Sequence, residues 1–142
     1  MNTVYWDTNV FIYQSTPESP YFKECLDFVG CCQERKIFIE TSVETIQEIV
    51  HVAQKQKLPH LGLQISKKAI QLTNKLYPVT EITIQKFLSL ADEYPSITSR
   101  DLIHVAVCLE NNISTIITYD KEFKTVEQIR SLTPKEFLNG NS

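Results

Sequence analysis

Apolar residues along this chain fall into short continuous runs separated by longer stretches with helical spacing. The short runs, rich in β-branched and aromatic residues, lie at Thr3–Trp6, Lys36–Glu40, Tyr77–Val79 and Ile113–Thr118. Runs of this length and composition predict buried strands. A last short element is expected near Ile129–Leu132, where Pro134 follows.

The intervening stretches repeat their apolar residues every third or fourth position, which predicts helices. The predicted helices cover Asn9–Gln14, Tyr21–Cys32, a segment from Thr41 or Ser42 to about Gln56, Leu61–Leu76, Glu81–Glu93 and Leu102–Leu109. Strands that alternate with helices imply an α/β fold with a mainly parallel sheet and right-handed crossovers. In such sheets, functional residues gather at the carboxyl ends of the strands.

Composition indicates one globular domain. The chain has 142 residues, of which 42% are hydrophobic and 22% charged, enough for a core of ordinary size. No apolar run approaches the roughly 20 residues that span a bilayer, and Asp7 interrupts the region where a signal peptide would be apolar. The four cysteines form no C-x-x-C pair, which favours reduced thiols over disulfides or a zinc site. We therefore expect a cytoplasmic protein without a membrane segment.

Charge is distributed unevenly. The net charge of −3 does not by itself indicate a nucleic-acid partner, but the segment from His51 to Thr80 contains five lysines and no acid. These lysines are Lys55, Lys57, Lys67, Lys68 and Lys75. The segment is either a phosphate-binding surface or a solvated helical face.

Four acids occupy positions that suggest a site. Asp7 follows the first predicted strand and Asp120 follows the Ile113–Thr118 strand, so both lie at carboxyl ends. Asp101 falls in the first turn of its helix, which Thr98 or Ser99 can cap. Glu48 lies within a helix beside apolar neighbours. Each of these acids taken alone is also compatible with a turn former, a capping residue or a solvated helix residue.

Converging carboxylates repel one another and are costly to bury, so a cluster of them usually needs a cation. Oxygen ligands of this kind suit Mg²⁺ or Mn²⁺, which can activate water and stabilise charge on a phosphodiester. The two histidines nearest the acids along the chain, His51 and His104, are interpreted as hydrogen-bonded packing residues. The chain has no G-x-G-x-x-G or Walker loop, so dinucleotide or nucleoside triphosphate binding has no support.

Several segments, in order along nearly the whole chain, resemble the PIN-domain family. They are DTNVFIY, SVETIQEIVHV, RDLIHVAVCLENNISTIITYDKEF and SLTP. The chain is most similar to the small ribonuclease toxins of VapBC-type toxin–antitoxin pairs. The resemblance implies a Rossmann-like three-layer α/β/α sandwich, a single PIN domain over residues 1–142 with a helical arm at about 51–76, and an acidic site that binds Mg²⁺ or Mn²⁺ and cleaves RNA.

Carried over by position, the resemblance assigns residues to this site. The catalytic and metal-binding acids would be Asp7, Glu48, Asp101 and Asp120, with Asn9 and Thr118 in support. Glu44 competes with Glu48 as the second acid, but the E-I-V-H-V context favours Glu48. The residues expected to contact RNA are Arg100, Lys55, Lys57, Lys67 and Lys68.

The same resemblance implies an RNA substrate, a small antitoxin protein as partner, and a homodimer. Three other functions stay open. An aspartyl phosphatase of the haloacid dehalogenase type also has an Asp after its first strand, but it needs a second acid where this chain has Asn9. The other two are a non-catalytic PIN-like scaffold or RNA-binding module, and a free-standing PIN nuclease without an antitoxin. The RNA target, the number of metal ions and the identity of the antitoxin are not encoded in any recognisable motif.

Overall fold

The computed structural model describes residues 2–140, which fold around a five-stranded sheet with strand order β3-β2-β1-β4-β5. All four strand pairings are parallel. The strands are β1 (Thr3–Trp6), β2 (Phe38–Ser42), β3 (Lys75–Tyr77), β4 (Thr115–Ile117) and β5 (Arg130–Leu132). The predicted α/β fold with a parallel sheet is therefore confirmed.

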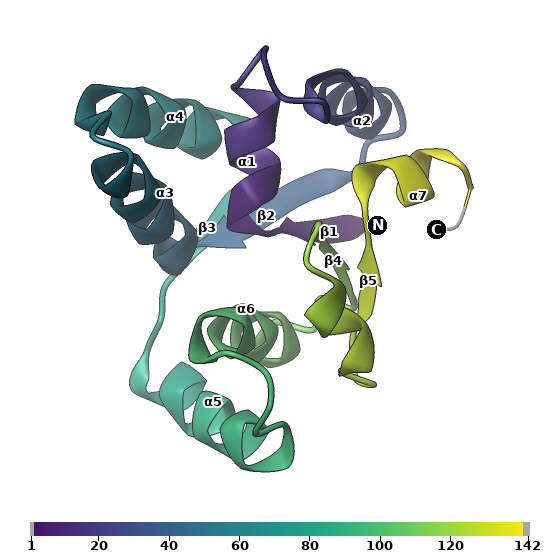
Figure 1. The fold of residues 1–142 in the computed structure, drawn as a ribbon. Helices are drawn as coiled ribbons and strands as arrows, with labels where there is room; N and C mark the ends of the chain where they lie inside the picture. The colour runs from purple at the N-terminus through teal and green to yellow at the C-terminus, as the bar shows by residue number, and fades with distance from the viewer. Residues whose placement is uncertain (1, 141–142) are drawn as a thin grey trace.

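Helices cover both faces of the sheet (Figure 1). They are α1 (Thr8–Gln14), α2 (Phe22–Glu34), α3 (Val43–Lys55), α4 (Pro59–Leu72), α5 (Glu81–Glu93), α6 (Ser99–Glu110), the 3₁₀ helix η1 (Lys121–Thr125) and α7 (Pro134–Leu138). The core cluster on one face takes side chains from α1, α2, α3, α4 and α7. The cluster on the other face takes them from α5, α6 and η1. The result is the three-layer sandwich expected from the sequence.

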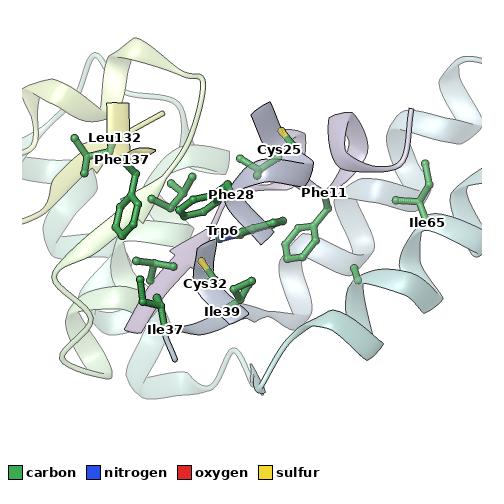
Figure 2. Packing of buried hydrophobic residues seen from close by; sticks show 14 of the residues in the cluster. Trp6, Phe11, Cys25, Phe28, Cys32, Ile37, Ile39, Ile65, Leu132 and Phe137 are labelled. Carbon is green, nitrogen blue, oxygen red and sulfur yellow. The ribbon is translucent and has the colours of Figure 1, made fainter. Parts of the chain in front are cut away.

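Alternation along β1 separates the two cores. Val4 and Trp6 lie in one cluster and Tyr5 in the other, because successive side chains of a strand point to opposite faces. The Trp6 ring lies between those of Phe11 and Phe28, at centroid distances of 4.9 and 5.6 Å (Figure 2). This aromatic packing fixes the carboxyl end of β1. It therefore also fixes the position of Asp7, which directly follows that strand.

The boundaries of β2, of β3 and of the helix before β3 differ from the predicted ones. β2 extends to Ser42 rather than Glu40, and β3 is Lys75–Tyr77 rather than Tyr77–Val79. The helix predicted to reach residue 76 ends instead at Leu72. Asn74 explains the difference, because its side-chain oxygen accepts a hydrogen bond from the backbone N–H of Ile39 and its own N–H donates back to the carbonyl of Ile39. This pairing draws the chain into the sheet before residue 75.

Proline starts two helices. α4 begins at Pro59, where the sequence indicated a break, because a proline needs no intrahelical partner in the first turn. α7 was not predicted. Pro134 follows Thr133, which forms a capping box with Glu136.

None of the helices within residues 2–140 is long and apolar enough to cross a membrane.

The predicted arm at 51–76 corresponds to the second half of α3, to α4 and to the chain entering β3. Its two helices pack closely where Gly62 meets Ala53, since a Cβ atom added at Gly62 would lie 2.5 Å from that of Ala53. α4 also contributes Ile65 and Ala69 to the core cluster. This segment is therefore part of the folded layer as well as a carrier of surface lysines.

Candidate functional site

The predicted acids line one cleft of about 380 Å³. The chain first builds β1, β2 and β3 outward and then returns to place β4 on the other side of β1. The carboxyl ends of β1 and β4 therefore flank the point where the strand order reverses, the usual ligand position in such sheets. Of the residues assigned from the sequence, the cleft is lined by Asp7, Asn9, Glu48, Arg100, Asp101 and Asp120.

Asp7 is the most enclosed of these acids. It directly follows β1, where its backbone N–H donates to the carbonyl of Ile117. Its Oδ1 accepts a hydrogen bond from the N–H of Thr8 at 2.8 Å, and its Oδ2 accepts one from the hydroxyl of Thr118 at 2.8 Å. Burial raises the pKa of Asp7, and the nearby ring of His104 together with these hydrogen bonds opposes that rise. The carboxyl group is therefore held in one orientation.

Thr118 joins Asp7 to the loop after β4. Its side chain is buried, and besides donating to Asp7 its Oγ1 accepts a hydrogen bond from the N–H of Asp120 at 3.0 Å. Its backbone N–H donates to the carbonyl of Leu132 in β5. The hydroxyl proton is thus committed to Asp7, so the geometry fits the predicted supporting position.

Three acids form a group within the same cleft. Carboxylate oxygens of Asp101, Asp120 and Glu122 all lie within 4.8 Å of one another. The N–H of Asp101 is capped by the Thr98 hydroxyl at 3.3 Å, and Oδ1 of Asp120 accepts from the N–H of Glu122 at 2.9 Å. Glu122 was not among the residues predicted from the sequence; its place two residues after Asp120 is the only sequence signal for it, and the 3₁₀ helix η1 brings it into the group.

Burial and the neighbouring carboxyl groups disfavour the ionised form of Asp101. Burial, the facing Asp120 carboxyl and the more distant Asp7 raise the pKa of Asp101 to about 8. A carboxyl group whose pKa lies this far above its ordinary range holds a proton at neutral pH unless a cation replaces it. The donor set consists of carboxylate oxygens, which are the ligands that Mg²⁺ and Mn²⁺ prefer. These residues therefore fit a divalent cation.

Glu48 makes its hydrogen bond to His104 rather than to another acid of the cleft. Its Oε1 lies 2.5 Å from Nε2 of His104, and Oδ1 of Asp7 lies 3.6 Å from the same nitrogen. His104 was predicted to be a hydrogen-bonded packing residue, but its buried ring contacts two acids of the site. Burial lowers the pKa of His104, but Glu48, Asp7 and Asp101 together raise it above its ordinary value.

The basic residues expected to contact RNA are spread more widely. Arg100 lines the cleft and is exposed. The four lysines are also exposed, but they lie at the end of α3, in the following turn and on α4, and none of them lines the cleft. Their role in binding RNA stays a prediction.

The fold and the cleft together define a Rossmann-like α/β protein with an acidic site at the reversal point of its parallel sheet. The family model described as PIN domain matches residues 4–129. The chain therefore belongs to the PIN-domain family, as its sequence segments predicted.

Two relatives from Mycobacterium tuberculosis are similar over most of their length. The chain is 24% identical to the protein named Ribonuclease VapC7 over 129 residues, covering 90% of this chain and 89% of the relative. It is 25% identical to Ribonuclease VapC23 over 117 residues, covering 82% of this chain and 92% of the relative.

Solved structures share the fold. The VapBC2 complex from Rickettsia felis, bound to a DNA fragment from its promoter, contains a chain with a TM-score of 0.73 at 15% identity, covering 92% of this chain and 98% of that chain. VapC20 of Mycobacterium tuberculosis, described as a toxin that cleaves the sarcin–ricin loop, has a TM-score of 0.68 at 14% identity, covering 87% of this chain and 95% of that chain.

Proposed function

We propose that this protein is a metal-dependent endoribonuclease and the toxin of a toxin–antitoxin pair. The observation that carries the proposal is the gathering of four acids in one cleft: one directly after β1, one in α3, one in α6 and one in the loop after β4. These acids come from elements far apart in the sequence, and burial together with the facing Asp120 raises the pKa of Asp101, as is common at functional sites. Relatives named as ribonucleases support RNA as the substrate class.

Asp101 and Asp120 would hold the ion, Mg²⁺ or Mn²⁺, together with Asp7 and Glu48 directly or through water. Glu122 adds a further carboxylate on the solvent side of this group. Such an ion supplies a nucleophilic water and stabilises negative charge on the phosphodiester when it is bound. The products would carry 5′-phosphate ends.

The other residues of the cleft have complementary roles in this proposal. Thr118 keeps the carboxyl group of Asp7 oriented through its hydrogen bond. Arg100 lies beside Asp101 with its side chain exposed at the cleft, so its guanidinium would bind a phosphate of the RNA backbone. Asn9 lines the same cleft and offers an amide to substrate or water.

The partner in this proposal is a small antitoxin protein, and the active form is a homodimer. The support is that a toxin–antitoxin complex from Klebsiella pneumoniae contains a chain of the same fold, with a TM-score of 0.67 at 18% identity. A short open reading frame immediately upstream of the gene is expected, and co-expression of its product should suppress growth arrest caused by this chain. Growth arrest without such a neighbouring gene would favour a free-standing nuclease.

The test is cleavage of a mixed RNA pool by the purified protein with Mg²⁺ or Mn²⁺, compared with EDTA. Asp101→Asn should abolish cleavage while keeping the fold. Asp92→Asn is the matched control, because it makes the same change at an exposed position of α5 outside the cleft. Cleavage by Asp101→Asn at the parental rate would refute the assignment. Absence of cleavage from folded parent with every metal would favour a binding or scaffold module.

A further inference from the structure

His104 is enclosed in the wall of the acidic cleft, with 1% of its surface exposed. It lies on α6, one helical turn after Asp101. Both nitrogens of its ring are engaged. Nδ1 lies 2.6 Å from the hydroxyl of Tyr5, and Nε2 lies 2.5 Å from Oε1 of Glu48.

We propose that His104 is a positioning residue that fixes the carboxyl group of Glu48 for cation binding. This inference rests on the proposed function and adds a residue that the sequence analysis assigned to packing. Through it, α6 would place two acids of the site: Asp101 directly and Glu48 by way of the histidine.

The hydrogen-bond directions follow from the partners. A carboxylate only accepts, so Nε2 carries the proton in its bond to Glu48, whether the ring is neutral or charged. At the other end of the ring, the hydroxyl of Tyr5 also lies 2.8 Å from Oγ of Ser42. Ser42 is the N-cap residue of α3, but its side chain makes no capping hydrogen bond. The chain Ser42–Tyr5–His104–Glu48 therefore links β2, β1, α6 and α3.

This arrangement gives Glu48 a defined position. Glutamate has three rotatable side-chain bonds, and holding it in one conformation is entropically costly. Two features limit the rotation of the Glu48 side chain. It makes a short hydrogen bond to His104, and only 13% of the side chain is exposed. Because one oxygen faces the imidazole, the other remains for a cation or its water. The same Nε2 lies 3.6 Å from Oδ1 of Asp7, so the histidine also spaces these two acids.

A packing role and a positioning role predict different responses to conservative substitution. A glutamine amide can reach the place of Nε2, whereas an asparagine amide is shorter and reaches the place of Nδ1. His104→Gln therefore retains a donor for Glu48, and His104→Asn retains only a partner for Tyr5. If the histidine were merely packing, the nitrogen that is retained would not affect the cation.

The experiment measures Mn²⁺ affinity of the RNA-free protein by electron paramagnetic resonance, for the parent, His104→Gln and His104→Asn. Thermal unfolding without metal checks that each variant is folded. Loss of a residue that orients a metal ligand typically weakens metal binding by about 10- to 100-fold. We expect His104→Asn to show this loss. The Mn²⁺ affinity of His104→Gln should be roughly tenfold higher than that of His104→Asn. Equal affinities for the two folded variants would overturn the proposal.

A double-mutant cycle with Glu48→Gln tests whether His104 affects Mn²⁺ binding through Glu48. If His104 acts through Glu48, His104→Asn should weaken Mn²⁺ binding little further once Glu48 has been replaced. Additive losses would overturn the positioning role. RNA cleavage is measured separately, so that a protein with this affinity pattern but no cleavage would refute the proposed ribonuclease activity and leave the role of His104 supported.

Discussion

Asp101→Asn should stabilise the metal-free protein while removing its response to metal. In the folded protein the pKa of Asp101 rises from its ordinary value of 3.8 to about 8 because of burial and the facing Asp120. The folded state therefore binds a proton that the unfolded state releases above about pH 4. Stability falls as the pH rises from about 4 to about 8, and asparagine, which does not titrate, escapes that loss.

The magnitude follows from the size of the shift. One pKa unit corresponds to about 1.4 kcal/mol, so the full rise from 3.8 to about 8 would correspond to between about 5 and 6 kcal/mol. Water still reaches this side chain, which is only partly buried, and screening reduces the gain to about 1–2 kcal/mol. For a domain of this size, that gain raises the melting temperature by roughly 3–8 °C.

The assay is thermal unfolding of the parent and Asp101→Asn at pH 8 and pH 4.5, with EDTA or with Mn²⁺. With EDTA, the variant should melt higher at pH 8, and the difference should shrink at pH 4.5. With Mn²⁺ at about 100 times its Kd, the parent should gain about 2.7 kcal/mol and the variant much less. Asp92→Asn serves as the control and should match the parent throughout. A variant that melts lower than the parent at pH 8, or that gains as much from Mn²⁺, would refute this reasoning.

Three further predictions use other parts of the structure. Thr118→Val removes the hydroxyl that binds Asp7 and should cost about 1–3 kcal/mol of unfolding free energy in urea titrations, with reduced RNA cleavage; unchanged stability and activity would contradict it. Gly62→Ala should destabilise the protein by about 1–3 kcal/mol because the added methyl meets α3, whereas Gly30→Ala, in open space on α2, should be neutral or stabilising; similar effects at the two glycines would be the contrary result. Because the pKa of Asp101 is about 8, Mn²⁺ must displace a proton; its affinity should therefore rise from pH 6 to pH 8, and calorimetry in buffers of different ionisation enthalpy should detect proton release. A pH-independent affinity would be inconsistent with this.

The layer architecture was predictable because the apolar pattern is strong. The run TVYW alternates between two cores, and Leu102–Leu109 is apolar except at His104 because α6 is covered on most sides. The register at the edge of the sheet was not predictable. Lys75 and Leu76 were predicted as the end of a helix, but the hydrogen bonds between Asn74 and Ile39 and the pairing with β2 place them in a strand.

Some residues of the candidate site could also be predicted from the sequence, and others could not. Asp7 and Asp120 could be placed from strand ends alone, because parallel strands bring their carboxyl ends to one edge. His104 could not be distinguished from a core histidine, since its contact with Glu48 joins residues 56 positions apart. Glu122 was overlooked because its proximity to Asp101 depends on the turn of η1.

Metal-dependent cleavage of RNA at this acidic cleft can be tested by adding metal back to EDTA-treated protein. The protein is freed of metal, mixed with a structured RNA pool, and given Mn²⁺ or Mg²⁺, with Asp101→Asn and Asp92→Asn in parallel. We expect no cleavage before the metal is added, discrete cuts with 5′-phosphate ends after it, the same cuts from Asp92→Asn and none from Asp101→Asn. Cleavage that persists in EDTA, or that survives Asp101→Asn, would contradict this expectation.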